Sequence, residues 1–527
     1  MAAMPYTRRL KRWIGVGAAL GALCAPFAVT AAPPSAQVAW VTAASSPDVD
    51  RAFAQAAERR RPLLLYWGAS WCPPCNQLKA TLFNRQDFAS LARSFVVVHV
   101  DGDRPGAQAL GQRFRVGGYP TLVLFRPDGQ ELTRLPGEAE PAQVLDLMRM
   151  GLAGGRTARE ALADARAGRP LKAEEWRLLA FYSWDTDDAQ LLGGATAADR
   201  LAELAPAAAR SGAAPDVVAR LWLQALAASD DGKGVKADDP LRNQLRSVLA
   251  DPVQTRQYAD LLVNRSAEIV YSAGERPEQR QEFVRLLDPV LRRFEADTSL
   301  SRADRMSALI SRVDLARIEQ PRRDTRPQLP AALLAEVREH AARADREITD
   351  AYERQAVIPS AAYALERAGL WDESESLLLS NLPRSHAPYY LMSQLGSLHR
   401  KLGHRDQALR WYADAFERSQ GPATRLQWGT SYLQALIELA PADAARIETT
   451  ATRLFDEAAK DRSAFHKRSA RSLQRAMKAL DNWGRADDRA AALKRLHTRL
   501  AGLCAKVGAA DGGRERCRAL LSDGPAA

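Results

Sequence analysis

Two cysteines separated by two prolines, in the stretch YWGASWCPPCNQLK over residues 66–79, constrain the fold of this chain more than any other feature. The residues before them, LLLYW, form a short apolar run that predicts a buried strand, and the residues after them predict a helix. Cys72 then lies at the N-terminus of that helix, where unpaired backbone N–H groups and the helix macrodipole favour an anion and lower the pKa of a thiol. Pro73 suits the first helical position, because it lacks an N–H group that would be unpaired there.

Three kinds of site can use Cys72 and Cys75. A zinc site needs four ligands, and none of the seven histidines has the spacing of a second ligand pair. A structural disulfide across so short a loop would restrict the unfolded chain little. A redox pair needs a nucleophilic thiolate and a second thiol one helical turn away, which resolves the mixed disulfide. We favour the redox pair, with Cys72 as the attacking and Cys75 as the resolving cysteine, and we expect neither a metal nor a bound cofactor.

The chain around this pair alternates short apolar runs with helical patterns. Buried strands are predicted in RPLLLYW, SFVVVHV (residues 94–100) and PTLVLF (residues 120–125), and the turn residues of RPDGQELTRL predict a hairpin to one more strand. Residues 33–46 are predicted to be a small-residue spacer, with Ser46 and Pro47 starting a helix that runs to Arg60. Residues 47–152 therefore predict an α/β domain in the order helix, strand, helix, strand, helix, strand, strand, helix.

SWCPPC, the strand before it, the segment FRVGGYPT (residues 114–121) and the hairpin after it resemble the thioredoxin family, in particular the periplasmic branch that includes the C-terminal domain of DsbD. The resemblance implies a thioredoxin fold over residues 47–152 and a cis peptide bond between Tyr119 and Pro120 that faces the cysteine pair. It also implies that the backbone of Tyr119 pairs with an extended substrate, that Pro120 shields the sulfurs and that Trp71 forms part of the docking surface.

The sequence departs from the cytosolic thioredoxins at two places. Tyr66 stands six residues before the first cysteine, where those proteins keep a buried acid, and Pro73 and Pro74 replace Gly-Pro between the cysteines. Both changes are expected to alter the redox poise, in a direction that the sequence leaves open. His99, near the end of a predicted strand, is interpreted as a core or edge residue without a catalytic role.

Residues 155–527 show helical spacing only, so we predict a thioredoxin fold followed by a large all-α region, divided into 155–330 and 331–527. Polar breaks rich in Gly or Pro are predicted over 229–240 and 319–330. Gly369 aligns with Gly403 at a separation of 34 residues, the tetratricopeptide period, and the pattern around Gly403 extends to Gly396 and Tyr412. The region is therefore predicted to be tetratricopeptide-like, with an irregular helical bundle as the alternative.

The first residues predict export. A basic stretch, TRRLKR, precedes an apolar run and a small-residue exit, so residues 1–31 are interpreted as a signal peptide, with an uncleaved inner-membrane anchor facing the periplasm as the alternative. Removal of the leader lowers the formal charge from +11 to +7, which weakens the case for nucleic-acid binding. Basic runs such as HKRSARSLQR (residues 466–475) are interpreted as solvated helix faces. We expect contact with a membrane only if the leader is uncleaved.

Cys504 and Cys517 bracket a polar turn between two helical patterns. In an exported protein we favour a structural disulfide there over a second redox pair. The sequence as a whole predicts a periplasmic or secreted thiol-disulfide oxidoreductase that exchanges disulfides with protein partners and with an external redox partner, and whose helical region binds those partners. The alternative is a non-catalytic scaffold or chaperone-like protein that uses a thioredoxin fold for binding.

Overall fold

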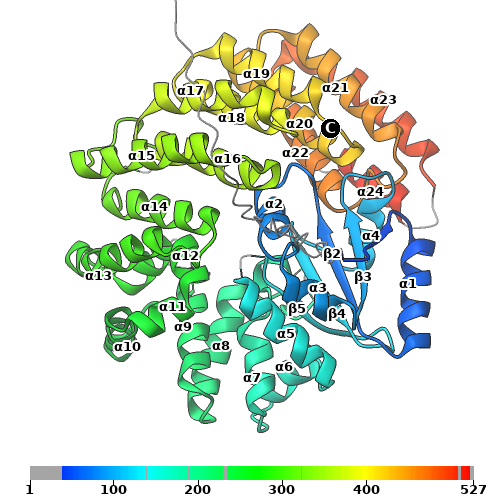
Figure 1. Ribbon diagram of the computed structural model, residues 1–527. Coiled ribbons are helices and arrows are strands. Elements are labelled where there is room, and N and C mark those ends of the chain that lie inside the picture. The colour runs from blue at the N-terminus through cyan, green and yellow to red at the C-terminus, as the bar shows by residue number, and fades with distance from the viewer. Residues whose placement is uncertain are drawn as a thin grey trace, which may run out of the picture. The chain divides into compact units, whose positions relative to one another are not determined.

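A five-stranded sheet lies near the N-terminus of the computed structural model, and helices follow it to the C-terminus (Figure 1). The structure describes residues 38–137, 139–187, 190–229, 234–321, 323–508 and 512–522; the predicted signal peptide lies outside these ranges. The predicted fold class, an α/β domain followed by an all-α region, is confirmed. Within the described ranges, no helix combines the length and the apolar character that crossing a membrane requires.

The sheet has the strand order β1-β3-β2-β4-β5. Strands β1 and β2 run parallel to β3, whereas β4 runs antiparallel to both β2 and β5. Every residue of β2 is buried, as the predicted apolar run requires. The strands are β1 (Val41–Ala43), β2 (Leu63–Gly68), β3 (Val96–Asp101), β4 (Thr121–Phe125) and β5 (Glu131–Leu135).

Two parts of the N-terminal prediction are wrong. The spacer predicted over 33–46 contains β1, which pairs with Val98–Val100 of β3, so the sheet begins earlier than expected. The helix after β1 is capped by Ser45, and Pro47 stands in its first turn. One helix was expected between the first two predicted strands, but a turn over 81–84 divides it in two. The helices of this domain are α1 (Ser46–Arg59), α2 (Pro73–Ala80), α3 (Gln86–Ala92), α4 (Ala107–Arg113) and α5 (Pro141–Ala153).

The first half of the helical region shares a core with the sheet. Leu64 and Leu122 of the sheet belong to the same buried apolar cluster as Trp176 and Leu201. The predicted breaks over 229–240 and 319–330 separate α9 from α10 and α14 from α15. The helices are α6 (Ala158–Arg166), α7 (Ala173–Ala180), α8 (Ala197–Arg210), α9 (Pro215–Ala227), α10 (Asp239–Ala250), α11 (Pro252–Gln257), α12 (Ala259–Ala273), α13 (Pro277–Ala296) and α14 (Arg302–Ala316).

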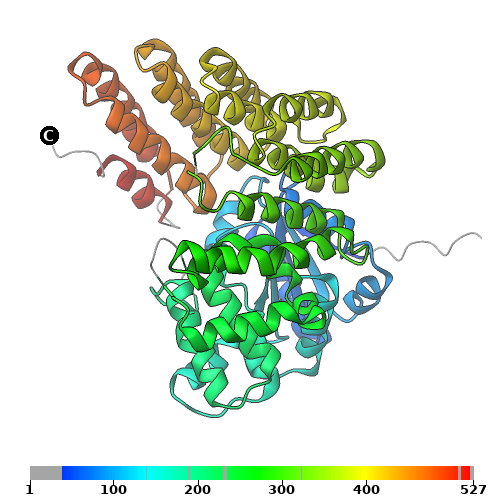
Figure 2. The same cartoon turned by 90° about the vertical axis from the view of Figure 1, so that its left-hand side faces the viewer.

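The second half consists of helices that lie side by side in successive pairs (Figure 2). Gly369 and Gly403 join the pairs α16–α17 and α18–α19, with φ of 78° and 79°. A Cβ at Gly396 would stand 3.0 Å from the Tyr412 ring, so this glycine lets α18 approach α19 closely. The assignment of these pairs as tetratricopeptide-like repeats stays a prediction. The helices are α15 (Ala331–Glu347), α16 (Ala351–Arg367), α17 (Trp371–Asn381), α18 (Pro388–Lys401), α19 (Arg405–Arg418), α20 (Pro422–Leu439), α21 (Ala444–Ala459), α22 (Lys467–Trp483), α23 (Ala490–Lys506) and α24 (Gly513–Ser522).

Candidate functional site

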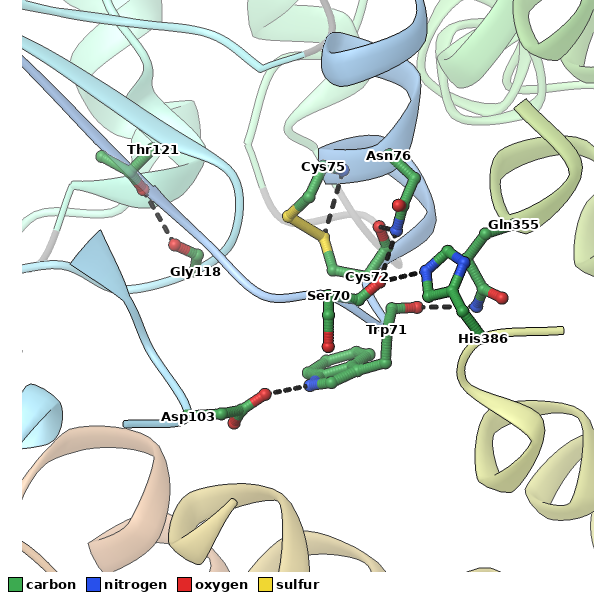
Figure 3. Close-up of a disulfide and its surroundings, with 10 residues drawn as sticks. All are labelled: Ser70, Trp71, Cys72, Cys75, Asn76, Asp103, Gly118, Thr121, Gln355 and His386. Atoms are coloured by element: carbon green, nitrogen blue, oxygen red, sulfur yellow. Dashed lines mark hydrogen bonds between the residues drawn. A yellow bond between two sulfur atoms is a disulfide. The ribbon is translucent and has the colours of Figure 1, made fainter. Parts of the chain in front are cut away.

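Cys72 and Cys75 form a disulfide at the start of α2, just beyond the end of β2 (Figure 3). Cys72 is the N-cap residue of α2, and the Cys75 N–H group donates to its Sγ at 3.2 Å. The side-chain amide of Asn76 donates to the carbonyl oxygens of Ser70 (2.7 Å) and Cys72 (2.8 Å) and so holds the chain that leads into the helix. An N–H group aimed at Sγ, together with the helix N-terminus, stabilises a Cys72 thiolate when the pair is reduced.

The peptide bond between Tyr119 and Pro120 is cis, as the resemblance implied. Tyr119 and Gly118 line the same cavity as Cys72. The Tyr119 hydroxyl accepts a hydrogen bond from Gln108 of α4 at 2.8 Å, and Pro120 is buried against Gly137. The backbone that leads into β4 therefore faces the cysteine pair, whereas the predicted substrate roles of Tyr119 and Pro120 stay predictions.

Trp71 is covered by the helical region, which the sequence did not predict. Its ring stacks on Tyr390 of α18, with centroids 6.0 Å apart, and meets the Trp428 ring of α20 edge-on at 6.0 Å. Its carbonyl accepts from the Gln355 amide of α16 at 2.9 Å, and His386 Nε2 lies 3.0 Å from the Ser70 carbonyl (Figure 3). Trp71, the predicted docking residue, is thus already packed against the chain's own helices. Cys72 next to it is only 2 % exposed.

A buried carboxylate joins the two regions beside Trp71. Asp103, in the loop after β3, accepts a hydrogen bond from Trp71 Nε1 at 2.8 Å and further bonds from Thr424 and from Arg468 of α22. Burial raises the pKa of Asp103, and the Arg468 guanidinium opposes that rise. The same guanidinium lies 5.1 Å from the centroids of both the Trp71 and the Tyr119 ring. Asp103 and Arg468 therefore hold α22 against the site.

A cavity of about 290 Å³ lies next to Cys72. The α/β domain lines one side of it, and Lys467, Arg468 and Arg471 of α22 line the other. The interpretation of residues 466–475 as a solvated helix face holds for Arg471, which is exposed, but is wrong for Lys467 and Arg468, which are partly buried. A signal was available in the sequence, since no acidic residue occurs between His466 and Leu480.

Tyr66, which stands where cytosolic thioredoxins keep a buried acid, lies beside His99 in the core behind the site. The Tyr66 ring stacks on His99, with centroids 5.0 Å apart. Burial raises the pKa of Tyr66, and its hydroxyl has no hydrogen-bond partner among the described residues. Burial also lowers the pKa of His99 to about 4, and Lys79 and Arg104 add to that effect. Both side chains belong to the packing of the sheet.

Cys504 and Cys517 form the second disulfide, between α23 and α24. Both are buried in the core of the C-terminal helices. Arg516 of α24 donates through Nε to the Phe465 carbonyl at 2.8 Å, directly before α22. The bridge thus lies in the packing that positions α22. Across the described ranges, no three potential ligands of the His, Cys, Asp or Glu type gather as a metal site would require.

Comparison with known proteins places the similarity in the N-terminal domain. The family model for a thioredoxin-like domain matches residues 49–151. DsbD 1 of Pseudomonas aeruginosa is 26 % identical over 125 residues, which are 23 % of this chain and 21 % of that protein, so the chain spans about a fifth of this relative's length. The thioredoxin-like protein slr0233 of Synechocystis sp. is 30 % identical over 106 residues, 19 % of this chain and 96 % of that protein. Thioredoxin H5 of Arabidopsis thaliana is 34 % identical over 97 residues, 18 % of this chain and 76 % of that protein.

Among solved structures, a thioredoxin from Thermus thermophilus shares 30 % sequence identity with this chain, with a TM-score of 0.19. The match covers 22 % of this chain and 86 % of the thioredoxin.

Proposed function

The chain belongs to the thioredoxin-like family, and from this premise we propose that it is an exported thiol-disulfide oxidoreductase that uses Cys72 and Cys75. The observation that carries the proposal is the disulfide between these residues at the N-terminus of α2, next to the cis peptide bond at Pro120. A chain that keeps both features retains the groups that disulfide exchange requires.

The exchange proceeds in two steps. The Cys72 thiolate of the reduced protein attacks one sulfur of a partner disulfide, which forms a mixed disulfide and releases the other sulfur as a thiolate. The Cys75 thiolate then attacks Cys72 Sγ, which releases the partner's second sulfur as a thiolate and restores the Cys72–Cys75 disulfide. Two electrons pass to the partner, and a dithiol-bearing redox partner returns them.

The helical region serves in this proposal to select protein partners. Its support is the contact of Tyr390, Trp428 and Gln355 with Trp71, since a partner that docks there has to fit against, or displace, these side chains. The proposal places the protein in the periplasm or outside the cell, because the sequence predicts a signal peptide over residues 1–31. N-terminal sequencing of the mature protein tests this placement: a start at Ala32 supports cleavage, and an intact leader in the membrane fraction supports an anchor.

The catalytic proposal is tested with insulin reduction by the full chain and by Cys72→Ser and Cys75→Ser variants. The wild type is expected to turn over, Cys72→Ser to lose turnover, and Cys75→Ser to accumulate a mixed disulfide through Cys72. Equal activity of the wild type and Cys72→Ser contradicts the proposal.

The second candidate is a non-catalytic binding protein. The observation that favours it is the burial of Cys72, which is 2 % exposed behind the helical region. The absence of turnover by the reduced wild type, together with the absence of a mixed disulfide in Cys75→Ser, supports this candidate over the oxidoreductase.

A further inference from the structure

The cavity beside Cys72 has walls of different character. The α/β wall is apolar and aromatic, with Trp67, Trp71 and Tyr119, whereas α22 contributes Lys467, Arg468 and Arg471. None of the residues that the structure places on the cavity wall carries a carboxylate. Cys72 and three cations therefore line the same cavity.

The three cations differ in their surroundings. Arg468 is paired with Asp103. Arg471 donates to the Gly117 carbonyl at 2.9 Å and has no ion pair among the described residues. Lys467 lies near Arg115, Arg134 and Arg471, and burial and these cations together lower its pKa to about 8. The positive side chains on the cavity wall would attract an anion that enters it.

The backbone at this place is held in a costly conformation. Lys467 and Arg115 have φ of 44° and 49°, in the left-handed region that residues with a Cβ avoid. Such strain persists where the surrounding structure imposes it, and it gathers at ligand sites. Of the three non-glycine residues with this conformation, one starts α22 and one is a cation near it, whereas the third, Arg60, ends α1 outside the cavity.

We propose that the cavity binds a carboxylate of the disulfide substrate while Cys72 attacks its sulfur, so that the site prefers disulfides with carboxylates close to sulfur. This inference rests on the proposed function and adds the substrate's chemistry to it. The carboxylate has two sources: a small free disulfide, or an acidic segment next to a cysteine of a protein.

The test measures the second-order rate constant at which pre-reduced full-length protein is oxidised by small disulfides, read by trapping free thiols. The probes are dithiodipropionate, which carries two carboxylates, and hydroxyethyl disulfide, which is neutral and similar in size. Each reaction converts one protein dithiol and one disulfide into the Cys72–Cys75 disulfide and two small thiols. Cys72→Ser gives the background from other cysteines.

The informative variant is the double substitution Lys467→Gln and Arg471→Gln. It is expected to lower the rate constant for dithiodipropionate about three- to tenfold and that for hydroxyethyl disulfide less than about twofold. The matched control is Lys478→Gln, an exposed residue of the same helix outside the cavity, which is expected to change neither rate constant. Added salt should reduce the wild type's preference, because screening weakens the attraction.

An equal fall for both disulfides, which would indicate a structural role, or an unchanged rate for dithiodipropionate overturns the inference. If reduced wild type reacts with neither disulfide faster than Cys72→Ser does, the proposed function itself fails, so the two failures are distinguishable. A folded carrier protein with thiopropionate on a surface cysteine separates the two sources. A charge-dependent reaction with it supports the protein-borne carboxylate, and reaction with free dithiodipropionate alone supports the small disulfide.

Discussion

Cys72 receives its environment from residues close to it in the sequence and from residues far away. The Cys75 N–H group and the first turn of α2 act on its sulfur directly, whereas Arg468 acts through Trp71 and Asp103. The first set would exist in an isolated α/β domain. The second set requires α22, so the reactivity of Cys72 is a property of the whole chain.

His99 is expected to make the stability of the protein vary with pH, because burial in the folded state disfavours its protonated form. Its pKa is about 4 in the folded protein and about 6.5 in an unfolded chain. Below pH 6.5 the unfolded chain therefore binds more protons, so stability is complete above that pH and falls as the pH drops towards 4. The expected loss is on the order of 3 kcal/mol.

The variant that tests this is His99→Phe, which keeps a ring against Tyr66 and removes the titrating group. Midpoints of urea unfolding at pH 7 and pH 4.5 are expected to differ more for the wild type than for the variant. Other titrating groups are common to both proteins and cancel in the comparison. The same pH dependence in the two proteins would show that His99 is not the responsible group.

The sequence predicted the residues whose partners are near in the chain or belong to the family motif. Cys72, Cys75 and the cis bond at Pro120 are of this kind. Lys467 and Arg471 are not of this kind, because their helix meets the α/β domain across a long sequence distance. The neighbouring Arg468 N–H group, for example, donates to Gln108, which is 360 residues away in the chain. A basic run at helical spacing is consistent with solvent exposure and with a cavity wall, and only tertiary packing decides between them.

At the scale of elements, helices with clear end signals in the sequence were predicted, whereas a short strand without a periodic pattern was missed. Gly369 and Gly403 end their helices in the left-handed conformation that glycine adopts readily, so the helix pairs were expected. Strand β1 has only three residues and no periodic pattern, and its pairing with β3 gives it order. Its existence therefore depends on a partner more than 50 residues away in the chain.

Close packing of α20 against its neighbours depends on Gly429. A Cβ there would stand 2.8 Å from Leu454 Cδ1 of α21 and 2.9 Å from Phe416 Cε2 of α19, and both of these side chains are fully buried. Gly429→Ala gains about 1 kcal/mol in helix propensity, but overpacking costs about 1–3 kcal/mol, so we expect a net loss of stability of about 1 kcal/mol.

Gly502 of α23 is the matched control for that substitution, because it is exposed and a Cβ there would have no heavy atom within 4 Å. Gly502→Ala is expected to stabilise by about 0.5–1 kcal/mol. Thermal unfolding midpoints of the two variants should therefore shift in opposite directions. A rise of the same size for Gly429→Ala would mean that α19 and α21 yield to the added methyl group.

At the scale of the whole molecule, several helices of the C-terminal regions are attached around the redox pair. Gln77 of α2 donates to Ser301 and Asp304 at the start of α14, at 3.0 and 2.9 Å. Gln355 of α16 bonds to Trp71, and Arg468 of α22 to Asp103. The sequence predicted a thioredoxin-like domain and a helical region one after the other, but it held no information on how the second encloses the active face of the first.

Access to Cys72 should therefore depend on the contact between Arg468 and Asp103. Arg468→Met keeps most of the side-chain volume but leaves a buried carboxylate without its cation, a loss that costs about 3–5 kcal/mol. Because only the closed arrangement bears this cost, we expect α22 to detach. The measurement is alkylation of reduced Cys72 by a polymer-linked maleimide and by iodoacetamide.

The rate for the bulky reagent is expected to rise about tenfold or more relative to that for the small one, since only the bulky reagent needs the helices to open. Arg475→Met is the control, because this arginine of the same helix is exposed and, among the described residues, hydrogen-bonds to Ser472 of its own helix. The double variant Asp103→Leu and Arg468→Met removes the unpaired charge and should recover most of the protection, since an apolar pair can replace a buried ion pair. If the ratio of the bulky-reagent rate to the small-reagent rate is the same in Arg468→Met as in the wild type, the ion pair does not control access. The packing of Trp71 against Tyr390 and Trp428 then suffices to keep the site closed.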